Sequence, residues 1–152
     1  YDFHEPSILH ASDLASKQGV SDNCRFEVAL SKNFPGEDYD LICTFDCLHD
    51  MGDPAGAAAH IHQALKPDGL FLVVEPMAAD TLEGNLTPLG KLAYAASTLV
   101  CVPTSLAQEV GMALGAQAGE TRLSQVIREG GFSSVRRAVE TPFNLVLEAR
   151  KS

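Results

Sequence analysis

The sequence predicts an α/β fold whose sheet is mainly parallel and ends in an antiparallel hairpin. Two apolar runs without helical spacing, Leu41–Cys43 and Leu70–Val74, are typical of buried strands. The last two predicted strands, 133–140 and 144–150, are separated by three residues. So short a connection requires an antiparallel pair, because a parallel crossover needs about a dozen residues or more. Strands and helices alternate before this hairpin, which favours one mainly parallel sheet.

The first part of the chain predicts one helix and one strand. Ile8, Ala11 and Leu14 recur at helical spacing and predict a helix over about 5–18. Apolar residues then alternate with polar ones over 25–30, which predicts a strand.

The next part predicts a strand, a loop and a helix. The strand at 39–43 is expected to be buried on both faces, as at the centre of a parallel sheet. Asp53 is the expected N-cap of a helix over 54–65, with Pro54 in the first helical position. The Lys66–Gly69 segment is expected to turn the chain into the strand at 70–74.

A helical insertion over about 77–118 interrupts the alternation of strands and helices. Apolar residues at helical spacing predict one helix within it. Ser105 with Gln108 reads as a capping box that opens a further short helix. Another helix is expected through Glu129, ended by Gly130 and Gly131.

Composition limits the classes of function. The 152 residues suffice for a single domain with a sizeable core. The formal net charge of −9 argues against binding to nucleic acid or to an anionic membrane. No apolar stretch is long enough for a membrane span, and the four cysteines form no C-x-x-C pair. We therefore expect a cytoplasmic protein with reduced thiols.

Five short features follow one another along the chain: Asp2 between a strand and a helix, Tyr39–Cys43 with Leu48 and His49, the turn Ala64–Gly69, the turn Gly130–Phe132, and the terminal hairpin. Their order and spacing resemble the class I S-adenosylmethionine-dependent methyltransferases, which have a Rossmann-like sheet. The Phe45–Asp50 segment, together with the long insertion, resembles a bacterial subgroup of small-molecule methyltransferase-like proteins.

The resemblance also implies that one part of the family's domain is missing. Nothing in the sequence matches the family's glycine-rich loop, which follows the first strand. We therefore expect the chain to be the carboxyl-terminal part of a longer protein, with a sheet that lacks its first strand. An exposed edge at the centre of the sheet would have unpaired backbone groups that can pair with another chain, so we expect a homo-oligomer. We also expect the isolated segment to be inactive.

The resemblance assigns two groups of residues to the cofactor S-adenosylmethionine. Asp2 would accept hydrogen bonds from the ribose hydroxyls, and the alternative is a solvated carboxylate. Phe3 would pack on the adenine or belong to the core. The residues at the adenine edge would be Ala29, Leu30 and Ser31, although many family members have an aspartate at the position of Leu30.

Residues Thr44, Phe45 and Asp46 are assigned to the methionine portion of the cofactor. The rule that ligands bind beyond the carboxyl ends of parallel strands supports the same placement. The alternative is an ordinary loop between a strand and a helix.

His49 is the candidate general base, since an ordinary histidine pKa suits proton removal from a hydroxyl or amine. The alternative is a histidine that packs over the cofactor. Candidate substrate contacts are Glu75, Met77, Tyr94 and Thr98, each of which could instead be a solvated or core residue. No metal site is predicted, because His60 and His62 are two residues apart on a helix and point to different faces.

Taken together, these features predict methyl transfer from S-adenosylmethionine to an unknown small molecule. The alternative is a non-catalytic, methyltransferase-like domain of a regulator that binds the cofactor or mediates oligomerisation. A nicotinamide-dependent dehydrogenase is disfavoured by the terminal hairpin and by the lack of a phosphate-binding glycine motif.

Overall fold

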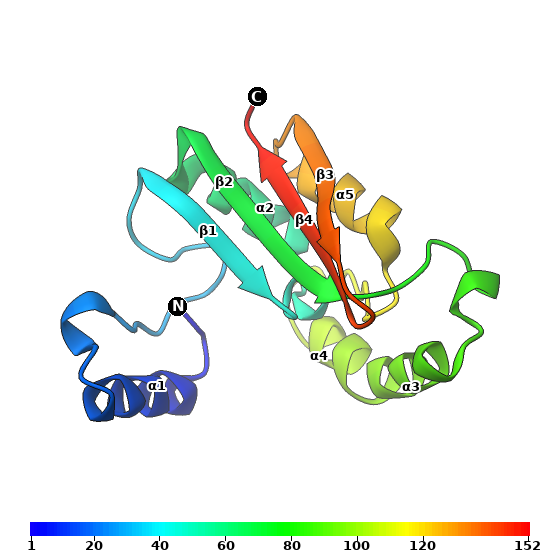
Figure 1. Ribbon diagram of the computed structural model, residues 1–152, viewed down its shortest axis with the longest axis horizontal. Coiled ribbons are helices and arrows are strands. Elements are labelled where there is room, and N and C mark those ends of the chain that lie inside the picture. The colour runs from blue at the N-terminus through cyan, green and yellow to red at the C-terminus, as the bar shows by residue number, and fades with distance from the viewer. The chain divides into compact units, whose positions relative to one another are not determined.

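The computed structural model describes residues 1–152, which divide into two compact units, Tyr1–Gly36 and Glu37–Ser152. Figure 1 shows the elements of each unit. No helix in either unit is both long and apolar enough to cross a membrane.

The first unit is built around helix α1, Glu5–Lys17, which confirms the first predicted helix. The strand predicted over 25–30 is wrong, because this segment forms only an isolated parallel bridge between Asp2 and Val28. Two backbone hydrogen bonds accompany the bridge, from the Asp2 amide to the Glu27 carbonyl (3.3 Å) and from the Ala29 amide to the Asp2 carbonyl (3.0 Å). The alternating pattern is present, but too little chain runs beside it to form a ladder.

The second unit contains a four-stranded sheet in the order β1-β2-β4-β3. Its strands are β1 (Tyr39–Phe45), β2 (Leu65–Pro76), β3 (Ser134–Glu140) and β4 (Asn144–Arg150). The pair β1–β2 is parallel, and the pairs β2–β4 and β3–β4 are antiparallel. The α/β class and the terminal antiparallel hairpin are confirmed, in a sheet that is mixed.

Helices α2 (Pro54–Ala64) and α5 (Gly119–Glu129) pack together over one face of this sheet (Figure 1). The predicted cap of α2 is confirmed, because the Asp53 side chain accepts a hydrogen bond from the Gly56 amide at 2.8 Å. At the end of α5, a Cβ on Gly130 would lie 2.8 Å from the backbone of Ala58. A glycine there allows the two helices to approach closely.

Strand β1 is an edge strand of the four-stranded sheet, so the prediction that it is buried on both faces is wrong. Leu41 is 50% exposed and Phe45 is 66% exposed. The reason is that β1 pairs with β2 on one side only. The Lys66–Gly69 segment, expected as a turn, lies within β2, where the register with β1 shifts between Tyr39 and Leu41.

From residue 69 to residue 76, buried and half-buried residues alternate along β2. Phe71, Val73 and Glu75 are all buried on the side that the helices cover. Val73 pairs with Leu147 and Glu75 pairs with Leu145, and both leucines are fully buried. This alternation places one carboxylate at the end of an otherwise apolar core face.

Four short helical elements occupy part of the expected insertion: a 3₁₀ turn (Glu83–Asn85), α3 (Pro88–Ala96), a π-helical turn (Ser97–Cys101) and α4 (Val102–Leu106). The helix expected to begin at Ser105 is wrong, because α4 ends at Leu106 and the following segment, up to α5, is not helical. Ser105 and Gln108 each make at least one hydrogen bond to the loop after β1.

Candidate active site

The loop after β1 begins with a sharp change of direction at Asp46. This residue has a φ of +52°, and its amide donates to the Val74 carbonyl at 2.7 Å. A 3₁₀ turn, Leu48–Asp50, follows directly. Since β1 and β2 are parallel, the loop lies where both strands end, the expected place for a ligand site in an α/β sheet.

The side chain of Glu75, at the end of β2, makes hydrogen bonds to this loop. Its Oε1 accepts hydrogen bonds from the amides of Cys47 (3.2 Å) and Leu48 (2.9 Å). Its Oε2 lies 2.5 Å from Nδ1 of His49. Glu75 is 1% exposed and His49 is 3% exposed, so the pair is almost completely withdrawn from water.

The short contact with Glu75 assigns the proton of neutral His49 to Nδ1, because an ionised carboxylate only accepts hydrogen bonds. The lone pair of neutral His49 is then on Nε2. Burial by itself lowers the pKa of His49, but the hydrogen bond and charge of Glu75, with the charges of Asp50 and Asp46, outweigh it and raise the pKa above its ordinary value. Glu75 thus fixes the orientation of the His49 ring, and the raised pKa makes His49 a stronger base than a free histidine.

Two further groups lie next to His49 Nε2. Asp50 Oδ1 is 3.2 Å from it, and this buried oxygen has no hydrogen-bond donor. The Cys101 thiol lies beside them, and its pKa is raised, first by burial and then by the Asp50 carboxylate. Burial and the charge of Glu75 raise the pKa of Cys47 to about 11, so that thiol stays protonated.

Ser105 and Gln108 hold the far side of the loop. The Ser105 hydroxyl donates to the Met51 carbonyl at 2.8 Å and accepts from the Ala113 amide at 3.0 Å. The Gln108 side chain accepts from the Gly52 amide and donates to the Asp50 carbonyl. Sequence reasoning missed both roles, and the only available signal, polar residues after an apolar helix, indicated a cap instead.

Residues assigned to the methionine portion of the cofactor lie at the carboxyl end of β1. Thr44 is buried, and its Oγ1 has no hydrogen-bond partner. Phe45 and Asp46 are exposed. A buried hydroxyl without a partner is uncommon in proteins and is available to a ligand.

The candidate substrate residues are not brought together. Glu75 is directed at His49 and the loop amides, as described above. Met77 lies on a separate hollow of about 380 Å³, which Arg137 and Glu140 also line. Tyr94 and Thr98 lie in the helical segment, where the Thr98 hydroxyl donates to the Tyr94 carbonyl at 2.8 Å.

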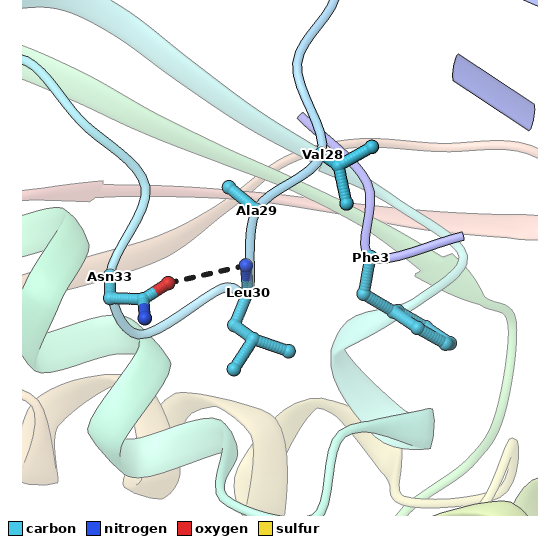
Figure 2. A pocket seen from close by; sticks show the side chains of 5 residues that line it. All are labelled: Phe3, Val28, Ala29, Leu30 and Asn33. Atoms are coloured by element: carbon cyan, nitrogen blue, oxygen red, sulfur yellow. Dashed lines mark hydrogen bonds between the residues drawn. The ribbon is translucent and has the colours of Figure 1, made fainter. Parts of the chain in front are cut away.

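In the first unit, three of the residues assigned to the cofactor line one open hollow of about 270 Å³: Phe3, Ala29 and Leu30 (Figure 2). Val28 and Asn33 complete its lining, and the Asn33 side chain accepts from the Leu30 amide at 3.3 Å. Mostly apolar walls of this kind suit a flat aromatic ring.

The other two assigned residues of the first unit lie outside this lining. Asp2 accepts a hydrogen bond from the His4 amide at 2.8 Å, ahead of α1. Ser31 is half-buried.

A family model described as a methyltransferase domain matches residues 4–113. The chain belongs to this methyltransferase family. The match covers both units and includes the loop that carries His49. Among curated proteins, none matches the sequence.

Solved structures show the same fold. The mitomycin 7-O-methyltransferase MmcR is 19% identical with a TM-score of 0.67, over 97% of this chain and 40% of its own. A structure described as PigF with SAH is 17% identical with a TM-score of 0.72, over 97% of this chain and 41% of its own. An O-methyltransferase family protein from Burkholderia thailandensis is 21% identical with a TM-score of 0.62, over 93% and 40%. The chain therefore spans about two fifths of the length of these proteins.

Proposed function

We propose that the protein containing this chain transfers a methyl group from S-adenosylmethionine to a hydroxyl group of a small molecule. The observation that carries this proposal is the buried pair of Glu75 and His49 at the carboxyl ends of β1 and β2. Family membership supports the cofactor, and so does the bound SAH named for one structural relative. Two of the relatives described above are named as O-methyltransferases or members of that family.

His49 removes the proton of the acceptor hydroxyl through Nε2. A hydroxyl is a poor nucleophile while it is protonated, so a base at the acceptor oxygen raises the rate of methyl transfer. Glu75 keeps the other ring proton on Nδ1 and stabilises the positive charge that the ring gains. Asp50 Oδ1, 3.2 Å from Nε2, stabilises the same charge from the opposite side of the ring.

The residues at the end of β1 fit the polar portion of the cofactor. Thr44 offers a buried hydroxyl that has no partner within the protein. The cofactor supplies an electrophilic methyl group on a positively charged sulfur. The carboxylate of Asp46 contributes negative charge on the same loop, which favours a cation.

The first unit fits the adenosine portion. Phe3 and Leu30 offer apolar walls for the adenine, in the hollow shown in Figure 2. Asp2 offers a carboxylate for the ribose hydroxyls. Leu30 cannot accept a hydrogen bond from the adenine amino group, so that bond is left to Ser31 or to the backbone.

Calorimetric titration of S-adenosylhomocysteine into this chain tests the cofactor. Binding that weakens at least tenfold in Phe3→Ala and Thr44→Val supports the proposal. Leu82→Ala, at an exposed apolar residue assigned to neither portion of the cofactor, is the matched control and should bind normally. Absence of binding both in this chain and in the natural protein that contains it would contradict the assignment.

The acceptor chemistry is tested in the natural protein with S-adenosylmethionine labelled in its methyl group and a panel of phenols and alcohols. His49→Gln should lower kcat by a factor of about 10² to 10⁴, as expected for loss of a general base. Cofactor binding by this variant should stay within about twofold of the wild-type value. Tight cofactor binding without methyl transfer to any member of the panel would favour the non-catalytic alternative.

A further inference from the structure

Three groups that can bind a metal converge on the loop after β1. His49, Asp50 and Cys101 each direct one ligand atom toward the others, and these atoms all lie within 4.8 Å of one another. Sequence reasoning considered only the histidines of α2, because Cys101 lies far along the chain in the helical segment.

Two carboxylates, those of Glu75 and Asp50, lie beside the two ring nitrogens of His49, so the surroundings favour a positive charge. With its proton on Nδ1, neutral His49 presents a lone pair at Nε2. A carboxylate oxygen of Asp50 lies 3.2 Å from this nitrogen. That oxygen is buried and has no donor. A neutral Nε2 and a carboxylate oxygen at this distance repel each other, and either a proton on Nε2 or a bound metal cation removes the repulsion.

From this geometry we infer that His49 Nε2, the Asp50 carboxylate and the Cys101 thiolate form a binding site for a divalent metal ion of the zinc type. Tetrahedral zinc with bonds of about 2.0–2.2 Å to nitrogen and oxygen requires about 3.3 Å between those two ligand atoms. The 3.2 Å separation of His49 Nε2 and Asp50 Oδ1 already meets this requirement. Cys101 Sγ lies within 4.8 Å of both atoms and would have to come within about 2.3 Å of the metal.

The surroundings of the cluster have the features of a metal site. Glu75 accepts the Nδ1 proton of His49, which is the usual carboxylate support of a zinc-bound histidine. Imidazole, carboxylate and thiolate together select zinc over magnesium or calcium, which prefer oxygen ligands alone. Three protein ligands leave a fourth position for water or for another ligand.

Metal binding uses the same Nε2 lone pair that the proposed base uses. Zinc would therefore inhibit methyl transfer, a consequence that rests on the proposed function. The binding itself does not rest on it, because it requires neither the cofactor nor an acceptor.

Titration of Co²⁺ into the purified chain, without cofactor, tests the site. We expect one equivalent to bind with a sulfur-to-cobalt charge-transfer band, and Zn²⁺ to displace it. Because the Cys101 thiol must lose its proton, calorimetry in buffers of different ionisation enthalpy should show proton release. Cys101→Ser should abolish the band, and Asp50→Asn should weaken binding at least tenfold.

Two other thiols provide matched controls. Cys24 is exposed and Cys43 is half-buried, and their serine variants should bind cobalt as the wild-type chain does. Circular dichroism of each variant establishes that it is folded. Absence of binding in the folded wild-type chain, a band that survives Cys101→Ser, or a band lost in Cys24→Ser would each overturn the inference. Because no cofactor is present, these outcomes are distinguishable from failure of the proposed methyl transfer.

Discussion

The two units hold their candidate functional residues in contrasting ways. In the second unit, His49 is buried and its loop is tied by Glu75 on one side and by Ser105 and Gln108 on the other. In the first unit, Phe3 and Leu30 are more than half exposed. Many hydrogen bonds therefore hold His49 and its loop in place, whereas the proposed adenine hollow is formed by exposed apolar side chains.

The largest effect should come from removing Glu75. Glu75→Ala leaves two loop amides and His49 without their buried partner, so the free energy of unfolding should fall by about 3–5 kcal/mol. Urea unfolding followed by circular dichroism measures the change. The control is Glu140→Ala, which removes an exposed ion pair with Arg137 and should lower the free energy of unfolding far less than Glu75→Ala does. Equal losses in the two variants would show that the loop does not depend on Glu75.

A smaller loss is expected at the other support of the loop. Ser105→Ala removes a buried hydroxyl that bonds both Met51 and Ala113, so unfolding should require about 1–3 kcal/mol less. Thr98→Ala is the control, because its exposed hydroxyl bonds only within its own helical segment, and it should stay within about 0.5 kcal/mol of wild type. If Ser105→Ala left the free energy of unfolding unchanged, the loop would be held by its contacts with β2 alone.

Acid should weaken a third tertiary contact in the second unit. Asp80 accepts hydrogen bonds from the Thr121 amide (2.8 Å) and hydroxyl (2.7 Å), and these bonds lower its pKa. A lowered folded-state pKa gives stability that is complete above the unfolded value of about 3.9 and is lost as the pH falls through the folded value. The stability difference between wild type and Asp80→Asn should therefore shrink with acidification in that range. Thermal unfolding from neutral pH downward measures it, and a difference that grows with acid would contradict the assignment.

The smallest effect on stability is expected in the first unit. Leu30→Ser changes an exposed side chain, so the free energy of unfolding should change by less than about 0.5 kcal/mol. Affinity for S-adenosylhomocysteine, measured by calorimetry, should nevertheless fall severalfold, because the variant removes an apolar wall of the proposed adenine hollow. A loss of stability as large as that of Ser105→Ala would remove the contrast between the two units.

Local patterns predicted most of the elements. The helices around Ile8, Ile61 and Leu123 follow from apolar spacing, and the cap at Asp53 follows from its position before a proline. The terminal hairpin follows from a connection too short for any other pairing. These features depend on residues that are neighbours in the chain, so sequence alone is sufficient for them.

The predictions of secondary structure were wrong where a segment contacts residues far away in the sequence, or lacks the neighbouring strand that its pattern requires. The alternation over 25–30 lacked an adjacent strand of sufficient length and formed one bridge. The apolar run in β1 was interpreted as central, but β1 pairs with a single strand and leaves Leu41 half exposed. Ser105 and Gln108 had the spacing of a cap but bond a loop more than fifty residues earlier in the chain.

The candidate site shows the same division. The position of His49 after a strand, at the carboxyl edge of an α/β sheet, follows from local sequence, since strand, loop and helix are each encoded by neighbouring residues. The contact of Glu75 with His49 and the position of Cys101 beside Asp50 become visible only in the folded chain. The physical reason is that these contacts depend on which strands pair and where the helical segment returns. Those choices minimise the free energy of the whole chain and are not encoded in any short window of it.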